Sequence, residues 1–93
     1  MDNKGLSRIL GLDYGDRRIG VALSDPLGII AKPFTVIDRK ITIDYISEIS
    51  NIISNKNISS IVVGLPLTLK GKVSNQTEIV LFFIDELKKI IDI

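Results

Sequence analysis

The feature that most constrains the fold is a carboxylate at the end of a short apolar segment, followed at once by a turn. Residues 8–13 read Arg-Ile-Leu-Gly-Leu-Asp, and residues 14–17, Tyr-Gly-Asp-Arg, are typical of a tight turn. Residues 18–24, Arg-Ile-Gly-Val-Ala-Leu-Ser, resume an apolar pattern that favours a strand. The sequence therefore predicts an antiparallel hairpin with Asp13 at the end of its first strand.

Two interpretations of Asp13 follow from this placement. Side chains alternate between the faces of a strand, so Ile9, Gly11 and Asp13 share one face, and the glycine leaves room there for something to approach. An ionised carboxylate taken out of water must be paired, hydrogen-bonded or bound to a metal, so we expect Asp13 to have a partner. Alternatively, Asp13 only caps the turn, because Asp often bonds to backbone two residues on.

Composition narrows the available chemistry. The 93 residues are 45% hydrophobic and 25% charged, which predicts one small folded domain over residues 1–93. The chain has no histidine and no cysteine, which excludes imidazole and thiolate nucleophiles and thiolate zinc sites. Any catalytic or binding chemistry must therefore use carboxylates, hydroxyls and amines.

Charge and hydropathy bear on location and partners. No basic and apolar leader and no membrane-spanning run is visible, so we expect a cytoplasmic protein without a membrane partner. A net charge of +1 neither favours nor disfavours nucleic acid. Basic residues cluster locally, although such pairs are more often solvated surface features. The clusters are Arg17–Arg18, Arg39–Lys40, Lys70 with Lys72, and Lys88–Lys89.

The middle of the chain predicts a third strand, a helix and a fourth strand. Residues 29–37 form the third strand, which Pro33 restricts to a sheet edge, and Asp25 belongs to the turn before it. Isoleucines at helical spacing predict a helix over 42–55. The continuous apolar run at 60–65 is typical of a strand buried on both faces. Residues 1–5 look disordered.

A second helix is predicted after a loop that holds Gly71. Ser74 or Asn75 is its cap, and Asn75 with Glu78 resembles a capping box. Phe82 and Phe83 are interpreted as core residues of this helix. Tyr14 is the aromatic residue expected near the ligand crevice described below, and its role stays open.

The order of elements predicts where a ligand would bind. A fourth strand that returns through a helix is expected to lie parallel to the first, by a right-handed crossover. Asp13 and Gly15 should then lie beside residues 64–66, Gly-Leu-Pro. A crevice at such a junction is the usual ligand position in α/β folds.

Two motifs in this order resemble a known family. Residues 10–25, Leu-Gly-Leu-Asp-Tyr-Gly-Asp-Arg-Arg-Ile-Gly-Val-Ala-Leu-Ser-Asp, residues 61–67, Ile-Val-Val-Gly-Leu-Pro-Leu, and Gly71 resemble the YqgF/RuvX family over nearly the whole chain. Its members are described as nucleases of pre-16S rRNA and were earlier described as Holliday-junction resolvases. The resemblance implies an α/β, ribonuclease H-like mixed sheet of order 3-2-1-4-5, in which strands 1–3 are antiparallel and strand 4 is parallel to strand 1.

The resemblance also implies a chemistry. It implies phosphodiester hydrolysis assisted by Mg²⁺ or Mn²⁺ in 5′-end maturation of pre-16S rRNA, with Asp13 as catalytic residue and metal ligand. Clustered carboxylates suit this reaction because hard cations take oxygen ligands. The expected crevice backbone is Gly15, Gly20, Gly64 and Pro66, and the expected nucleic-acid contacts are Arg17, Arg18, Lys70 and Lys72.

The family pattern continues beyond the motifs found here. Its members add a fifth strand with an Asp-Glu-Arg motif and a last helix with a Lys-Val-Asp-like motif, which supply further acids; both are absent from residues 1–93. We therefore expect a domain incomplete at its C-terminus, with weak or no nuclease activity unless another chain supplies ligands. Without a fifth strand, the edge of residues 60–65 is open, which predicts a homodimer or aggregation.

Three other functions stay open. The chain could act on branched DNA at Holliday junctions instead of RNA. It could be a non-catalytic RNA-binding or assembly module whose cations track phosphates around an inert site. A nucleotide-binding fragment of the actin and sugar-kinase type also carries an Asp-x-Gly loop in its first hairpin, but it needs a second phosphate loop and a longer chain.

Overall fold

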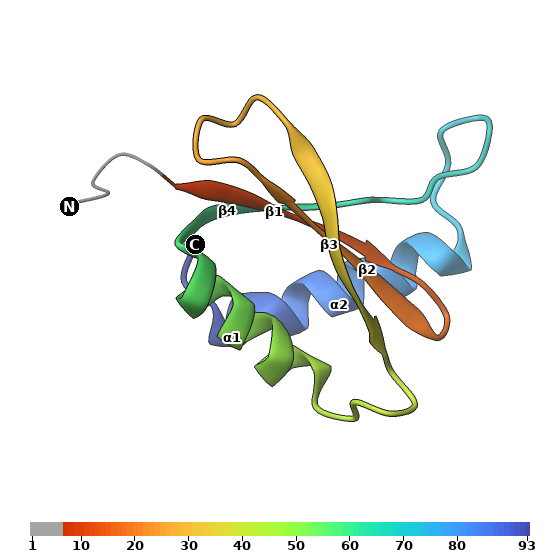
Figure 1. The fold of residues 1–93 in the computed structure, drawn as a ribbon. Coiled ribbons are helices and arrows are strands. Elements are labelled where there is room, and N and C mark those ends of the chain that lie inside the picture. The colour runs from red at the N-terminus through yellow and green to blue at the C-terminus, as the bar shows by residue number, and fades with distance from the viewer. Residues whose placement is uncertain (1–6) are drawn as a thin grey trace, which may run out of the picture.

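The predicted hairpin forms at the centre of a four-stranded sheet (Figure 1). A computed structural model describes residues 7–93, and the expectation for residues 1–5 lies outside this range. Strand β1 (Arg8–Tyr14) pairs antiparallel with β2 (Arg18–Ser24), and Asp13 stands opposite Gly20. Strand β4 (Ile58–Val63) pairs parallel with β1, and β3 (Ala31–Asp38) pairs antiparallel with β2. The order β3-β2-β1-β4 confirms the predicted mixed sheet.

Strand β3 begins two residues later than predicted because a turn extends to Ile30. The carboxylate of Asp25 accepts hydrogen bonds from the backbone N–H groups of Ile29 and Ile30, at 2.7 and 2.9 Å. These bonds hold the pKa of Asp25 below its usual value and confirm its role in the turn. Pro33 lies on the predicted edge strand, opposite Ala22 at a register irregularity, where a missing N–H is tolerated.

Both helices pack on one face of the sheet (Figure 1). Helix α1 (Tyr45–Lys56) begins later than predicted because the carboxylate of Asp44 caps it, accepting from the Ser47 N–H at 3.2 Å. Helix α2 (Asn75–Ile90) is capped by Ser74, which forms a capping box with Thr77. The predicted Asn75–Glu78 box is wrong, because α2 already starts at Asn75 and its third residue is Thr77. Among residues 7–93, no helix has the length and apolar character to cross a bilayer.

The core lies between the helices and the face of the sheet that they cover. Phe83 is only 2% exposed, whereas its neighbour Phe82 is 66% exposed, so the core prediction for Phe82 is wrong. Val80, Phe83 and Leu87 follow helical spacing on the buried side of α2, and position 82 falls outside that stripe. The buried apolar residues are Leu10, Leu12, Tyr14, Ile19, Val21, Ile37, Ile49, Ile52, Ile58, Val80, Phe83 and Leu87.

The other face of the sheet is open in the part of the chain that the structure describes. Strand β4 was expected to be buried on both faces, but Val62 is 60% exposed. Its apolar run reflects one face that packs under α2 and one face that no described element covers. Asp13 lies on the same open face, and its side chain is therefore exposed to solvent.

Candidate functional site

Asp13 is a solvent-exposed carboxylate at the carboxyl end of β1. Leu12 and Tyr14, its chain neighbours, are buried on the helix side, whereas Asp13 is exposed on the open face. The expectation that Asp13 is taken out of water is therefore wrong. Among residues 7–93, no hydrogen bond or ion pair holds its side chain, so the capping interpretation finds no support either.

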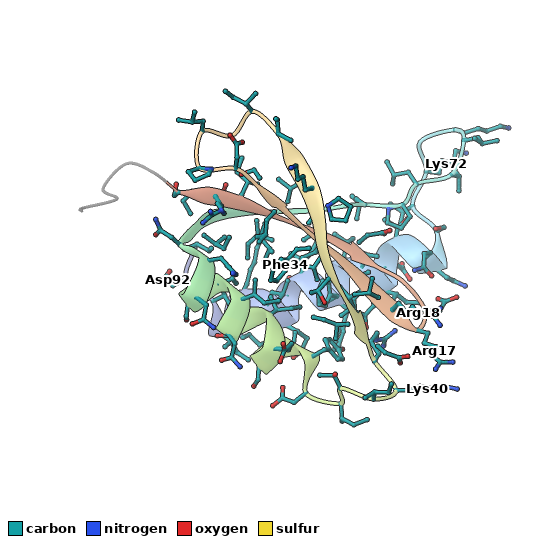
Figure 2. All side chains as sticks on the ribbon, viewed as in Figure 1. Arg17, Arg18, Phe34, Lys40, Lys72 and Asp92 are labelled. Atoms are coloured by element: carbon teal, nitrogen blue, oxygen red, sulfur yellow. The ribbon has the colours of Figure 1, made fainter. Side chains whose placement is uncertain are left out.

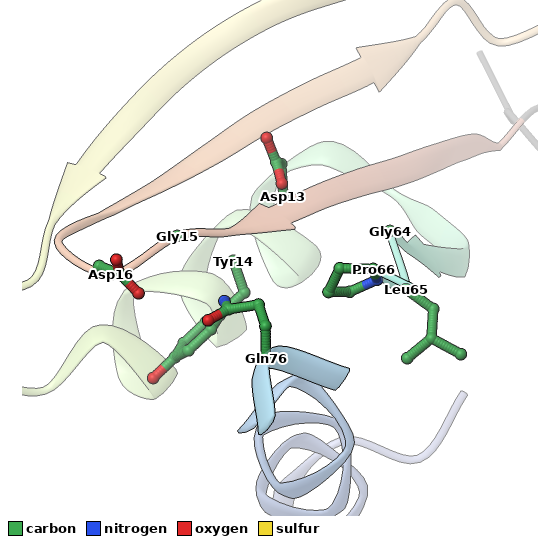
Figure 3. Close-up of a pocket in the computed structure, with 8 residues that line it drawn as sticks. All are labelled: Asp13, Tyr14, Gly15, Asp16, Gly64, Leu65, Pro66 and Gln76. Atoms are coloured by element: carbon green, nitrogen blue, oxygen red, sulfur yellow. The ribbon is translucent and has the colours of Figure 1, made fainter. Parts of the chain in front are cut away.

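A pocket lies where β1 and β4 end, as the crossover predicted (Figure 3). Its volume is about 480 Å³. The end of β1 and the following turn form one wall, the segment after β4 forms another, and the first turn of α2 closes the side between them. The lining residues are Asp13, Tyr14, Gly15, Asp16, Gly64, Leu65, Pro66 and Gln76.

The side chains around this pocket do not all converge. In Figure 3, the carboxylate of Asp13 projects away from α2, whereas Tyr14 and Gln76 lie on the α2 side. Gly20 does not line the pocket; it lies across the strand pair from Asp13, where an added Cβ would be 3.6 Å from the Asp13 Cβ. Asp13 therefore contributes to the lining of the pocket at the end of β1, while its carboxylate projects to solvent on the open face.

The β1–β2 turn requires a glycine. The N–H of Gly15 donates to the carbonyl of Arg18 at 2.9 Å. A Cβ added at Gly15 would lie 2.8 Å from that carbonyl oxygen, closer than real Cβ atoms come. Turn geometry therefore accounts for Gly15 in full, whereas Gly64 has no comparably close neighbour.

An arginine outside the predicted site anchors this turn. Nη1 of Arg39 donates to the carbonyls of Gly15 and Asp16, at 3.0 and 2.7 Å, and the guanidinium carbon lies 4.4 Å from the centre of the Tyr14 ring. Burial and the hydrogen bond with Tyr45 raise the pKa of Tyr14 to about 12. Tyr14, whose role the sequence left open, is thus a core residue that also lines the pocket.

The four predicted nucleic-acid contacts are exposed, and none of them lines the pocket. Arg17 and Arg18 follow the wall made by Gly15 and Asp16, and Figure 2 shows them at the tip of the hairpin. Lys70 and Lys72 belong to the loop that follows Pro66, which extends away from the sheet. Arg17 forms an ion pair with Asp38 at 3.1 Å.

The carboxylates that the structure describes do not make a complete metal site. Asp13 and Asp16 are the acids that line the pocket, and residues 7–93 contain no cluster of three or more potential metal ligands. Mg²⁺ takes six ligands in near-octahedral geometry, from carboxylates, substrate phosphates and water. The residues present therefore do not fit a protein-built site for this ion.

Sequence reasoning missed Arg39 and Gln76. Arg39 follows β3, which pairs with β2, so its position beside the hairpin turn depends on tertiary pairing. Gln76 follows the N-cap Ser74 by two residues; the sequence offered Ser74 or Asn75 as the cap, and it gave no signal that the first turn of α2 closes a pocket.

Comparison with known proteins places the fold in a family. A family model described as "RuvX: Holliday junction resolvase" matches residues 7–93. The chain is 43% identical over 86 residues to a protein of Roseiflexus sp. (strain RS-1), covering 92% of this chain and 61% of that protein. It is 48% identical over 85 residues to one of Sulfurihydrogenibium sp. (strain YO3AOP1), covering 89% and 56%.

A third relative comes from Clostridium botulinum (strain Hall / ATCC 3502 / NCTC 13319 / Type A), at 45% identity over 86 residues, covering 92% of this chain and 63% of the relative. All three relatives carry the name "Putative pre-16S rRNA nuclease". The chain spans about three fifths of the length of these relatives. The family model covers the sheet, both helices and the pocket, so this chain belongs to the RuvX family.

Proposed function

We propose that this chain takes part in hydrolysis of phosphodiester bonds in pre-16S rRNA at the 5′ end, with Asp13 as the catalytic carboxylate. The observation that carries the proposal is Asp13 itself, an exposed acid at the carboxyl end of a central strand in a RuvX-family fold, whose side chain has no partner among residues 7–93. Because no hydrogen bond or ion pair within the described residues holds this carboxylate, it is available for a reaction. The family placement favours this function over a nucleotide-binding fragment.

The reaction needs positive charge beside Asp13, because a carboxylate and a phosphodiester repel each other. Mg²⁺ or Mn²⁺ is the cofactor we propose, on the family resemblance. The described residues offer too few ligands for either ion alone. Additional oxygen ligands, from a second copy of the chain or from the substrate, are therefore part of the proposal.

The first test is cleavage of a single-stranded RNA that carries the 5′ precursor sequence, with Mn²⁺ present. Asp13→Asn should abolish cleavage. Asp85→Asn, which removes the same charge from an exposed position on α2, should leave it unchanged. A folded wild-type chain that cleaves nothing would overturn the proposal for these 93 residues.

A four-way DNA junction of matched sequence tests the nearest alternative. We expect preferential cleavage of the RNA, in keeping with the names of the relatives. Preferential cleavage of the junction would favour the activity in the family description instead. Binding of RNA without any cleavage would support a non-catalytic assembly module.

We assign phosphate contacts to Arg17, Arg18, Lys70 and Lys72, which are exposed and follow the pocket-lining residues Asp16 and Pro66 in the chain. Each phosphate contact on a single strand contributes about 0.7 to the slope of log K against log salt concentration. Arg18→Gln and Lys72→Gln should each lower that slope by about this amount. Lys88→Gln, near the far end of α2, serves as the control.

A homodimer through β4 is the proposed assembly. β4 is an edge strand in the described sheet, and the N–H of Gly64 points toward β1, where it donates to the Leu12 carbonyl at 3.0 Å. By alternation, the backbone groups of Ile61 and Val63 point to the open edge, which invites another strand.

Two exposed valines give a matched test of this assembly. Val62 on β4 and Val36 on the opposite edge strand are each 60% exposed on the open face. Val62→Lys should convert a dimer into monomers in sedimentation, and Val36→Lys should not. A wild-type monomer at all concentrations would contradict the dimer.

A cytoplasmic location remains a prediction.

A further inference from the structure

The β1–β2 turn forms one wall of the pocket, and few contacts within the hairpin hold it. One backbone hydrogen bond, from Gly15 to Arg18, closes the turn. The two carbonyls of Gly15 and Asp16 point outward from it, toward the end of β3. A turn of this kind needs an external support if the pocket is to keep one shape.

Arg39 meets both carbonyls with a single atom. Its Nη1 donates to the Gly15 and Asp16 carbonyl oxygens at 3.0 and 2.7 Å. Its backbone N–H donates to the Arg17 carbonyl at 2.8 Å, so the turn is bound from two sides by one residue. Charge-assisted hydrogen bonds of this kind are stronger than neutral ones.

The guanidinium of Arg39 in turn rests on aromatic rings of the core. It lies 4.4 Å above the centre of Tyr14 and 5.4 Å from that of Tyr45. Tyr14 stacks on Phe83 of α2, with ring centres 4.2 Å apart. A planar guanidinium can stack face to face on a ring while its edge donates hydrogen bonds, a geometry that the tetrahedral ammonium of lysine does not offer. The turn is thereby fixed relative to α2, whose first turn closes one side of the pocket.

The same side chain carries an unfavourable feature. The Nε of Arg39 is buried and has no hydrogen-bond partner within residues 7–93. A buried donor without an acceptor costs free energy, so an arginine is a poor choice for stability alone. The hydrogen bonds from Nη1 to the carbonyls of Gly15 and Asp16 better explain why an arginine stands at this position.

We propose that Arg39 is a positioning residue, whose guanidinium holds the β1–β2 turn against the Tyr14–Tyr45–Phe83 cluster and so sets the shape of the pocket beside Asp13. The catalytic part of this proposal rests on the proposed function. Arg39 touches no substrate in this scheme; it acts through Gly15 and Asp16.

Amide hydrogen exchange measures the hold on the turn without any nuclease assay. In Arg39→Gln and Arg39→Lys, the Gly15 amide should exchange at least tenfold faster, while amides of the β1–β2 ladder keep their rates. Lys40→Gln removes an adjacent, exposed charge and should change neither. Arg39→Lys should recover the melting temperature more than Arg39→Gln does, yet leave the turn equally loose. Unchanged exchange at Gly15 in both variants would overturn the proposal.

Cleavage of the precursor RNA then tests positioning. Because Arg39 does not contact substrate, Arg39→Lys should lower kcat about tenfold and leave KM within about twofold. A loosened turn with unchanged kcat would overturn the positioning role. If the wild-type chain cleaves nothing, the proposed function fails, and the shift of the Gly64 and Gln76 amide signals in Arg39→Gln decides the inference. Displaced signals support it, and unmoved signals overturn it.

Discussion

The two faces of β1 differ sharply although they alternate residue by residue. On the helix side, Leu10, Leu12 and Tyr14 are buried to 7% exposure or less. On the other side, Ile9 is 39% exposed, and Asp13 is exposed. Burial of large apolar side chains is the main source of stability in a domain of this size, so the helix side carries the fold.

Side chains on the open face of β1 and β2 contribute little to the stability of the fold. Three neighbouring positions on this face of β1 and β2 are small, namely Gly11, Gly20 and Ala22. Asp13 lies on the same face, at the end of β1. Substitutions on this face should therefore change activity or association without a large loss of stability. Substitutions on the helix side should do the reverse.

The largest contrast is expected between two adjacent phenylalanines of α2. Phe83→Ala should lower the free energy of unfolding by about 3–5 kcal/mol, because it leaves a cavity under Tyr14. Phe82→Ala, at 66% exposure, should change it by less than about 0.5 kcal/mol. Urea denaturation followed by circular dichroism measures both. Equal losses would show that the described open surface of α2 is covered in solution.

A second contrast separates two glycines of the hairpin. Gly15→Ala should cost about 1–3 kcal/mol, because the new Cβ would collide with the Arg18 carbonyl oxygen at 2.8 Å. Gly20→Ala meets only an ordinary contact on the open face and should cost less than about 1 kcal/mol. Thermal unfolding of the two variants gives the comparison. A costlier Gly20→Ala would mean that the open face is packed.

A smaller effect is expected in alkaline solution. Burial and the Tyr45 hydrogen bond raise the pKa of Tyr14 from 10.0 to about 12. A raised folded-state pKa favours the protonated fold, so this contribution is complete below pH 10 and is lost as the pH rises to about 12. Tyr14→Phe should flatten the fall of the melting temperature over this range. An identical slope in the variant would contradict the assignment. Absorbance at alkaline pH reports the same ionisation, since Tyr14 and Tyr45 are the two tyrosines of the chain.

Local patterns predicted the elements of this fold and their order. Alternation in 8–13 and 18–24, the proline of β3 and the isoleucine spacing of α1 each depend on near neighbours, and all four were interpreted correctly as to type. The errors concern how many layers cover a strand. Asp13 and Val62 were expected in the interior because their strands are apolar, but a strand pattern does not say whether one face or both are covered.

The candidate site was predicted in part for the same reason. Asp13, Gly15 and Gly64 could be brought together from the crossover rule, which concerns topology. Arg39 and Gln76 could not, because each reaches the site through side-chain geometry and cap placement. The role of Phe82 was missed because adjacent aromatic residues on a helix point 100° apart, and only the exact phase of α2 selects one of them.

The smallest effect on stability is expected for the residue with the largest proposed effect on activity. Asp13→Asn should change the free energy of unfolding by less than about 0.5 kcal/mol, because the carboxylate is exposed and has no partner among residues 7–93. Urea denaturation at pH 7 measures the difference. A loss above about 1 kcal/mol would show that Asp13 caps the turn after all, since an N- or turn-capping side chain contributes about that much. If stability is unchanged, any loss of cleavage in Asp13→Asn is due to the missing carboxylate and not to unfolding. The open face of β1 would then be the face that serves the reaction.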